Sequence, residues 1–355
     1  SDADFQARLL AWAQNSGRLE PIIPLLRQRV EKLSDVAPLI SYFFSGPVSI
    51  APESFSHCKL APVEACRALQ FALWKLEALG TWNRDEVESA LKINNEAATP
   101  TLVSWPGYST QQDLIEIGGE PTDFSPYGVH WKGNPGALDL IKARKIGVQD
   151  EGSQLVAEVF AKAADGSSWL DLCAGPGGKA ALLSSIARER NIQFTANEIS
   201  TARAELVSQV VHGDRVLVLD GRTISSLPEK FDAILIDAPC TGLGALRRRP
   251  EVRWRRSLQD LRALTQLQRE LVDSAIEALN PGGVLGYATC SPHLAETSIQ
   301  IADIKKKHTE LQQVPVDEYL PSSLHDATRD GAMSLWTHKH GTDAMYLALF
   351  RKDIG

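Results

Sequence analysis

The sequence predicts an α/β protein with an all-α N-terminal segment, and three observations support this. From Gln149 onward, strand-like runs alternate with amphipathic helical segments, which is the pattern of βαβ units in a mostly parallel sheet. Residues 1–92 instead repeat apolar side chains at helical intervals. Three of the strand-like runs end in loops with reactive side chains, at 171–179, 237–240 and 289–292. Because ligands bind at the carboxyl ends of such strands, we expect these loops to form one site.

The part of the chain before Gln149 divides into two predicted units. Residues 1–92 are expected to be helical, since apolar side chains recur at intervals of three and four, as at Leu69, Leu73 and Leu76. Residues 93–148 form the second unit, a small α/β linker subdomain. Its short alternating segments lie at 100–105, 111–117 and 128–131.

Residues 149–355 form the predicted sheet domain. Strands are expected at 169–172, 194–197, 216–219, 231–236 and 284–288. The main helices are expected at 180–188 and 258–279; Ser257 is placed to cap the second helix and Asn280-Pro281-Gly282 to end it. Segments 334–336 and 344–350 are expected to form a hairpin at the sheet edge.

The composition excludes several classes of protein. With 43% hydrophobic and 23% charged residues in 355, the chain has the composition of a soluble globular protein, and it lacks the long apolar run of a membrane-spanning helix. The first residues do not show the pattern of a secretory signal peptide. The five cysteines include no CxxC pair, which argues against both a disulfide framework and a metal site. We therefore expect a cytoplasmic location and no metal.

Positive charge is concentrated in one stretch although the net charge is −7. Residues 247–256, here called the arginine run, hold six arginines against one acid, Glu251. A solvated basic face is the alternative explanation of such a run. Its position shortly after the Cys240 loop favours contact with phosphate groups of a nucleic acid.

The loop Gly175-Pro176-Gly177-Gly178 joins a strand to a helix, where glycine lets the backbone approach a ligand closely. Such turns also occur for packing alone. Lys179 is followed by Ala180 rather than by Ser or Thr, so the loop is not a Walker motif. Glu198 ends the next strand, 27 residues after Asp171, and suits an acid that holds ribose hydroxyls. A nucleoside ligand other than ATP is therefore favoured. A surface acid at a strand end is the alternative explanation of Glu198.

Three aspartates, Asp171, Asp220 and Asp237, also stand at or near strand ends. Their carboxylates can accept hydrogen bonds from a nucleoside or a base, and helix capping is the alternative. We favour a functional role most strongly for Asp237, which directly precedes Ala238-Pro239-Cys240.

Two of the five cysteines are candidates for chemistry. An unpaired cysteine is most often a small buried apolar residue, which suits Cys58 and Cys66 and can explain Cys173. Cys240 and Cys290 fit that explanation poorly, since both lie in loops with proline and polar neighbours. No role is assigned to His293. A cysteine protease is disfavoured because it leaves the nucleoside loop unexplained.

These residues resemble a known family. Residues 149–350 are similar to the RNA 5-methylcytosine methyltransferases of the Fmu/Sun type, and the matching stretches come in the family's order. They are Gln149-Asp150-Glu151-Gly152-Ser153-Gln154, the loop from Asp171 to Lys179, Asp237-Ala238-Pro239-Cys240-Thr241-Gly242, and Thr289-Cys290-Ser291. The chain has Ala174-Gly175-Pro176 where the family commonly has Ala-Ala-Pro.

The resemblance implies a Rossmann-like methyltransferase domain with a mostly parallel, seven-stranded sheet, and S-adenosylmethionine as cofactor. It implies that Cys290 is the nucleophile, that Cys240 assists product release, and that Asp237 stabilises the reacting base. It assigns cofactor binding to Cys173, Ala174, Gly175, Pro176, Gly177, Gly178, Lys179, Glu198, Asp220 and Asp237. The substrate is expected to be rRNA or tRNA, contacted in part by Arg247, Arg248 and Arg249, and the protein is expected to be a monomer.

The N-terminal helices resemble a different protein. The stretch from Glu20 to Asp35, Phe43-Phe44 and the segment from Trp82 to Leu91 are similar to the anticodon-binding helical domain of glutamyl-tRNA synthetases. Neither aminoacylation signature occurs, so that activity is not expected. Two other functions stay open: a non-catalytic RNA-binding protein with a methyltransferase fold, and a tRNA-binding module.

Overall fold

The computed structural model describes residues 84–250 and 252–354. The chain divides into two compact units, one of residues 1–98 and 245–261, the other of residues 99–244 and 262–355. The helices expected before residue 84, together with Cys58 and Cys66, lie outside the described residues. In the described part of the first unit, α5 spans Arg84–Ile93 and α11 spans Val252–Arg255. No helix in the described ranges is long and apolar enough to cross a membrane.

The second unit begins with a small antiparallel sheet in the order β2-β3-β1-β4. Of the three short segments expected here, the first and third are strands and the second is a helix, which Thr110 and Asp113 begin with a capping box. Leu102, Leu114, Val129 and Ile146 form the core. The elements are β1 (Thr101–Ser104), α6 (Gln111–Glu116), β2 (Glu120–Pro121), β3 (Gly128–His130), η3 (Pro135–Ala137), α7 (Asp139–Lys142) and β4 (Ile146–Val148).

The large sheet of the second unit is built on five parallel strands in the order β7-β6-β5-β8-β9. They are β5 (Ser168–Asp171), β6 (Gln193–Asn197), β7 (Arg215–Leu217), β8 (Phe231–Asp237) and β9 (Leu279–Thr289). The reversed strand β13 (Tyr346–Lys352) pairs antiparallel with β9, and β12 (Ala332–Ser334) pairs with β13. This confirms the expected Rossmann-like order with a reversed end.

The strand count differs from the expectation. The sheet has nine strands in the described residues rather than seven, because β10 (Leu311–Val314) pairs with β13 and β11 (Thr328–Arg329) pairs with β12. The hairpin is also not a simple turn, since α14 (Thr337–His340) lies between its strands. The short 3₁₀ helices of this region are η7 (Val316–Glu318) and η8 (Ser322–Ala327).

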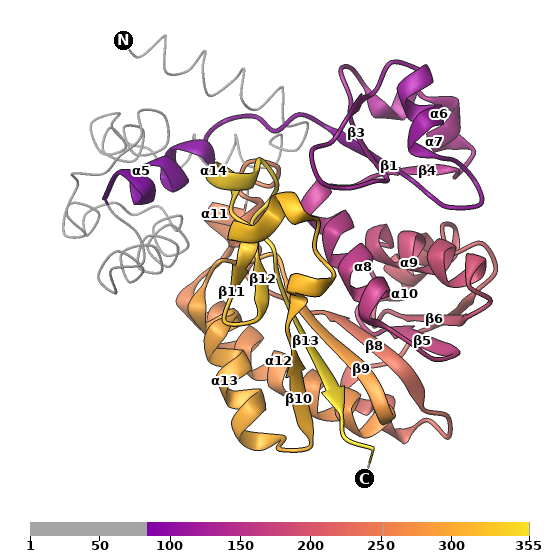
Figure 1. Cartoon of the computed structure of the whole chain (residues 1–355), viewed down its shortest axis with the longest axis vertical. Helices are drawn as coiled ribbons and strands as arrows, with labels where there is room; N and C mark the ends of the chain where they lie inside the picture. The colour runs from indigo at the N-terminus through magenta and orange to yellow at the C-terminus, as the bar shows by residue number, and fades with distance from the viewer. Residues whose placement is uncertain (1–83, 251, 355) are drawn as a thin grey trace, which may run out of the picture. The chain divides into compact units, whose positions relative to one another are not determined.

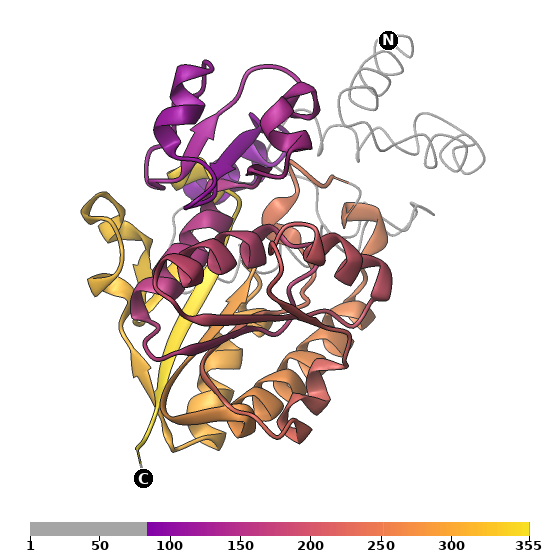
Figure 2. The same cartoon turned by 90° about the vertical axis from the view of Figure 1, so that its right-hand side faces the viewer.

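Helices cover both faces of the large sheet (Figures 1 and 2). On β8, Ala233 and Leu235 face one core while Ile234 and Ile236 face the other, as the two-residue period of a strand requires. The first core includes α8 (Glu151–Ala163), α9 (Gly178–Glu189) and α10 (Thr201–Ser208). The second includes α12 (Leu258–Ala278), α13 (Ser298–Lys307) and η4 (Gly221–Ser226). Helix α12 begins as expected, because the Ser257 hydroxyl accepts the N–H of Asp260.

The strand register brings the predicted loops to one edge of the sheet. Asp171 on β5 pairs with Leu235 on β8, and Asp237 pairs with Ala288 on β9. The strands therefore end side by side, so the glycine loop and the two cysteine loops leave the sheet together. The open α/β fold thus creates the crevice in which ligands bind in such sheets.

Candidate active site

The glycine loop needs glycine at two of its three glycine positions. Gly177 has a φ of +114° at the start of α9, and a Cβ there would lie 2.8 Å from a methyl group of Val210. A Cβ on Gly175 would lie 2.1 Å from the carboxylate of Glu198. A Cβ on Gly178 has no neighbour closer than 3.9 Å, where Gln149 lies. The loop backbone therefore packs tightly against Glu198 at Gly175 and against Val210 at Gly177, whereas space remains beside Gly178.

Glu198 is buried and bound to the glycine loop. One carboxylate oxygen accepts the N–H of Gly175 at 3.2 Å. The other accepts the N–H of Ser200 at 2.8 Å and a guanidinium N–H of Arg203 at 2.7 Å. A carboxylate fixed in this way stands ready to accept hydrogen bonds from a ligand hydroxyl. Arg203 was not foreseen from the sequence.

Lys179 and Asp237 form a buried ion pair between α9 and the end of β8. Lys179 Nζ lies 2.9 Å from Asp237 Oδ2, and the lysine is 9% exposed. Burial alone lowers the pKa of Lys179, but the Asp237 carboxylate outweighs it and leaves that pKa raised. Lys179 therefore stays charged and orients Asp237.

The two cysteines meet across the ends of β8 and β9. Their sulfur atoms lie 3.3 Å apart, and both residues are partly exposed. The hydrogen bond from Cys240 and the charge of Lys179 lower the pKa of Cys290. The pKa of Cys240 is raised, by the same contact with Cys290, by burial and by the charge of Glu296. The surrounding charges thus favour a Cys290 thiolate that accepts a hydrogen bond from the Cys240 thiol.

Asp171 and Cys173 lie at and just after the end of β5. Asp171 is fully buried, and burial together with the nearby Asp237 raises its pKa to about 8. Burial also raises the pKa of Cys173, which packs against the second core. Its packing is compatible with a small apolar residue, while its assignment to the cofactor site stays a prediction.

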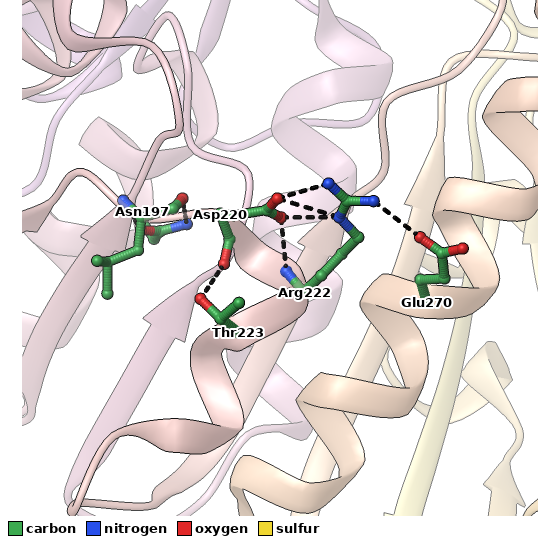
Figure 3. A network of polar contacts seen from close by, with 6 residues as sticks. Asn197, Asp220, Arg222, Thr223 and Glu270 are labelled. Atoms are coloured by element: carbon green, nitrogen blue, oxygen red, sulfur yellow. Dashed lines mark hydrogen bonds and ion pairs between the residues drawn. The ribbon is translucent and has the colours of Figure 1, made fainter.

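Asp220 is held by its own turn. Its carboxylate accepts the Nε–H of Arg222 at 3.0 Å and an Nη2–H at 2.7 Å, which lowers the pKa of Asp220 (Figure 3). Arg222 also reaches Glu270 on α12 at 3.1 Å. A cavity of about 450 Å³ borders this cluster, lined by residues of η4 and α12 and not by the cysteines. The side chain of Asp220 accepts the backbone N–H of Arg222 and so caps the start of η4, which is the helix-capping alternative given above.

Three buried polar atoms near the strand ends have no hydrogen-bond partner among the described residues. They are Gln149 Oε1, Asp171 Oδ2 and Thr289 Oγ1. Gln149 stands in a motif that the sequence singled out, yet no role was predicted for it. Its unpartnered oxygen and its place beside Gly178 make it a candidate for ligand contact.

His293 caps a short 3₁₀ helix, and the arginine run lies in the first unit of the chain. His293 Nδ1 accepts the N–H of Ala295 and caps η6 (Leu294–Glu296). The arginine run belongs to the first unit, where Arg248 and Arg249 N–H groups bond to the Ala245 carbonyl. No group of metal-ligating side chains is found within the described ranges.

Comparison with known proteins decides the family. Residues 159–351 match the sequence profile described as 16S rRNA methyltransferase RsmB/F, which covers more than half of the chain. The chain belongs to the RsmB/F methyltransferase family. Residues 4–97 match a second profile, the anticodon-binding domain, which agrees with the second resemblance found in the sequence.

Two bacterial relatives show how much of this RsmB/F-family chain is matched. A Mycobacterium tuberculosis protein named as a methyltransferase is 45% identical over 276 residues, which is 75% of this chain and 60% of the relative. Ribosomal RNA small subunit methyltransferase B of Yersinia enterocolitica is 35% identical over 202 residues, covering 55% of this chain and 46% of the relative. The chain thus spans about 60% or less of the length of these relatives.

Solved structures share the fold. PH0851 superposes with a TM-score of 0.68 at 27% identity, over 80% of this chain and 67% of its own. NSun6 from Pyrococcus horikoshii gives 0.69 at 17% identity, over 81% and 98%. These matches confirm the expected Rossmann-like methyltransferase fold.

The RsmB/F-family site fits the methyl donor of the fold. S-adenosylmethionine is a nucleoside with a positive charge, and Asp171, Glu198 and Asp237 supply negative or acceptor groups around an open glycine loop. The unpartnered oxygens of Gln149 and Asp171 are acceptors of the kind that such a ligand satisfies. The cofactor expected from the sequence is therefore confirmed for this family. Its individual contacts stay predictions.

Proposed function

We propose that this protein methylates C5 of cytosine in RNA, with Cys290 as the nucleophile. The observation that carries the proposal is the polarised cysteine pair, with sulfur atoms 3.3 Å apart beside the glycine loop. Cytosine C5 is too weak a nucleophile to take a methyl group unaided. A nucleophile that adds to C6 solves this problem by making C5 electron-rich.

The attack step uses the charges around Cys290. Its thiolate forms a bond to C6, and the C5–C6 π electrons move to C5. Lys179 supports the thiolate before the attack, since its charge lowers the pKa of Cys290. Asp237, oriented by Lys179 at 2.9 Å, is 28% exposed and can accept hydrogen bonds from the amino edge of the base.

The cofactor supplies an electrophilic methyl group to C5. In the proposal Glu198 holds the ribose hydroxyls, because its carboxylate is fixed by Gly175, Ser200 and Arg203 at the loop. Gly178 provides the open side of the loop, and Asp220 contributes an acceptor on the next strand end. The loop residues Cys173, Ala174 and Pro176 supply backbone and shape.

Product release requires transfer of the C5 proton to a base, which is solvent water in this proposal. The C–H electron pair then restores the C5–C6 double bond, and the C6–S pair returns to Cys290. Cys240 assists this step, since its sulfur lies within 3.3 Å of the departing sulfur and can donate a hydrogen bond to it. The target base must be unstacked to reach both thiols.

The RNA substrate is rRNA or tRNA in this proposal. Membership of the RsmB/F family supports rRNA, while the anticodon-binding match of residues 4–97 supports tRNA. The same match favours, as a second candidate, a tRNA-binding module without aminoacylation activity. Phosphate contacts are assigned to the arginine run through Arg247, Arg248 and Arg249.

Nucleoside mass spectrometry tests the proposal. The full chain is incubated with S-adenosylmethionine and with tRNA or ribosomal RNA fragments, and the RNA is digested to nucleosides. We expect 5-methylcytidine with the wild type and none with Cys290→Ala, whose cofactor affinity should remain near normal by calorimetry. RNA binding without any methylated nucleoside would support the second candidate instead.

A further inference from the structure

Glu296 lies buried directly behind the cysteine pair. It ends η6, which follows the Cys290 loop, and its side chain is 0% exposed. Oε1 accepts the N–H of Thr241 at 2.8 Å and an amide N–H of Gln268 at 3.2 Å, and Oε2 accepts the hydroxyl of Thr241. Both carboxyl oxygens of Glu296 are therefore held by neighbouring polar groups, two of which belong to Thr241.

These bonds hold the loop on both sides of Cys240. Thr241 follows the cysteine and is bound to Glu296 through its backbone and its side chain. Pro239 precedes the cysteine, and its carbonyl accepts an N–H of Gln268 at 2.9 Å. Gln268 is itself fixed, because its carbonyl oxygen accepts the hydroxyl of Tyr287 at 3.1 Å and an amide N–H of Gln300 at 3.0 Å.

The same network reaches the Cys290 loop. The hydroxyl oxygens of Thr241 and Ser291 lie 3.2 Å apart. The N–H of Gly244 donates to the carbonyl of Cys290 at 2.9 Å. The distance between the two sulfur atoms is therefore set by loops that are tied to each other and to Glu296.

The charges around the two thiols are unequal. Lys179 from α9, Asp237 from β8 and Asp343 from the loop before β13 act on Cys290, while Glu296 acts on Cys240. A negative charge on the Cys240 side disfavours its thiolate and keeps the proton there. Glu296 thus affects both the place of Cys240 and its protonation.

We propose that Glu296 is a positioning residue that holds Cys240, as a thiol, beside Cys290 and so controls the release step rather than the attack. The inference rests on the proposed cytosine methylation. Cys290 directly follows β9, and Lys179 supports its thiolate in addition to Cys240, so we expect attack on the base to depend on Glu296 less than release does.

The test separates attack from release with two RNA substrates. RNA with 5-fluorocytidine stops after attack and methyl transfer, because fluorine cannot leave C5 as a proton does. We expect Glu296→Gln to form this adduct within about threefold of the wild-type rate and to turn over ordinary RNA about tenfold or more slowly. The adduct should accumulate on ordinary RNA in a denaturing gel, and the pH profile of turnover should shift toward lower pH.

Controls make each outcome decisive. Glu158→Gln alters another buried glutamate, paired with Lys162 on α8, and should leave both rates unchanged. Thr241→Val, which removes one donor only, should show a weaker form of the Glu296→Gln effect and serves where that variant does not fold. Equal turnover of Glu296→Gln and Glu158→Gln, with no accumulated adduct, overturns the inference. A wild type that forms neither adduct nor 5-methylcytidine overturns the proposed function instead.

Discussion

Replacing Lys179 by methionine removes a positive charge at the cofactor loop that pairs with Asp237 and helps to lower the pKa of Cys290. Methionine keeps the length and apolar stem of lysine but cannot pair with Asp237, whose Oδ2 lies 2.9 Å from Nζ. Loss of one partner of a buried pair costs about 3–5 kcal/mol. Since Asp237 is 28% exposed, water can solvate the remaining carboxylate, and we expect the lower end of this range, about 3 kcal/mol.

The substitution also affects the chemistry of Cys290. After the hydrogen bond from Cys240, the charge of Lys179 helps to lower the pKa of Cys290, so removal of Lys179 raises that pKa. Less Cys290 is then thiolate at neutral pH, and we expect the rate of adduct formation on 5-fluorocytidine RNA to fall about tenfold or more. Raising the pH should restore much of the rate, because the thiol then ionises without help.

The assay measures adduct formation against pH for wild type, Lys179→Met and Lys179→Arg, with denaturant unfolding in parallel. Lys179→Arg preserves the charge and should retain most of the activity. An unshifted pH profile in Lys179→Met, with an equal loss of rate at every pH, refutes the thiolate argument. The lysine would then act on the cofactor or on the fold alone.

Three further predictions concern the loop, the buried acid and the arginine run. Gly175→Ala should weaken S-adenosylmethionine binding about tenfold in calorimetry, because the new Cβ would lie 2.1 Å from the Glu198 carboxylate and push it aside. Gly178→Ala should leave the affinity unchanged, because a Cβ there has no neighbour closer than 3.9 Å. Equal affinities of the two variants would contradict this prediction. Asp171 has a pKa raised to about 8 in the fold, so stability should fall as pH rises from about 4 to about 8; Asp171→Asn should remove that slope in denaturant unfolding. Replacing Arg247, Arg248 and Arg249 by alanine should reduce the slope of log affinity for RNA against log salt concentration by about one unit per lost phosphate contact. An unchanged slope would indicate that these arginines form only a solvated basic face.

The parallel core of the fold could be predicted because its signals are local. Buried strands such as β8 are continuous apolar runs, and the helices between them carry their own caps, as Ser257 does for α12. Strands β10 and β11 were missed. They are short edge strands whose pairing with β13 and β12 depends on the position of the rest of the sheet.

The chemistry of the site was predictable where residue type and strand end coincide. Cys240, Cys290 and Asp237 follow apolar strands, so the fold class alone brings them to one edge. Glu296 and Gln149 could not be found in this way. Glu296 acts through Thr241, 55 residues away in the chain, and Gln149 is marked only by an oxygen that its neighbours leave without a partner.

The covalent step is tested most directly with Cys240→Ala, RNA and S-adenosylmethionine. The denatured product is digested with protease and nuclease and analysed by tandem mass spectrometry. We expect a peptide in which Cys290 carries a 5-methylated cytidine, and no such peptide from Cys290→Ala. A nucleotide attached to another residue, or an attached cytidine without the methyl group, would contradict the assignment of Cys290 as the nucleophile of a C5 methylation.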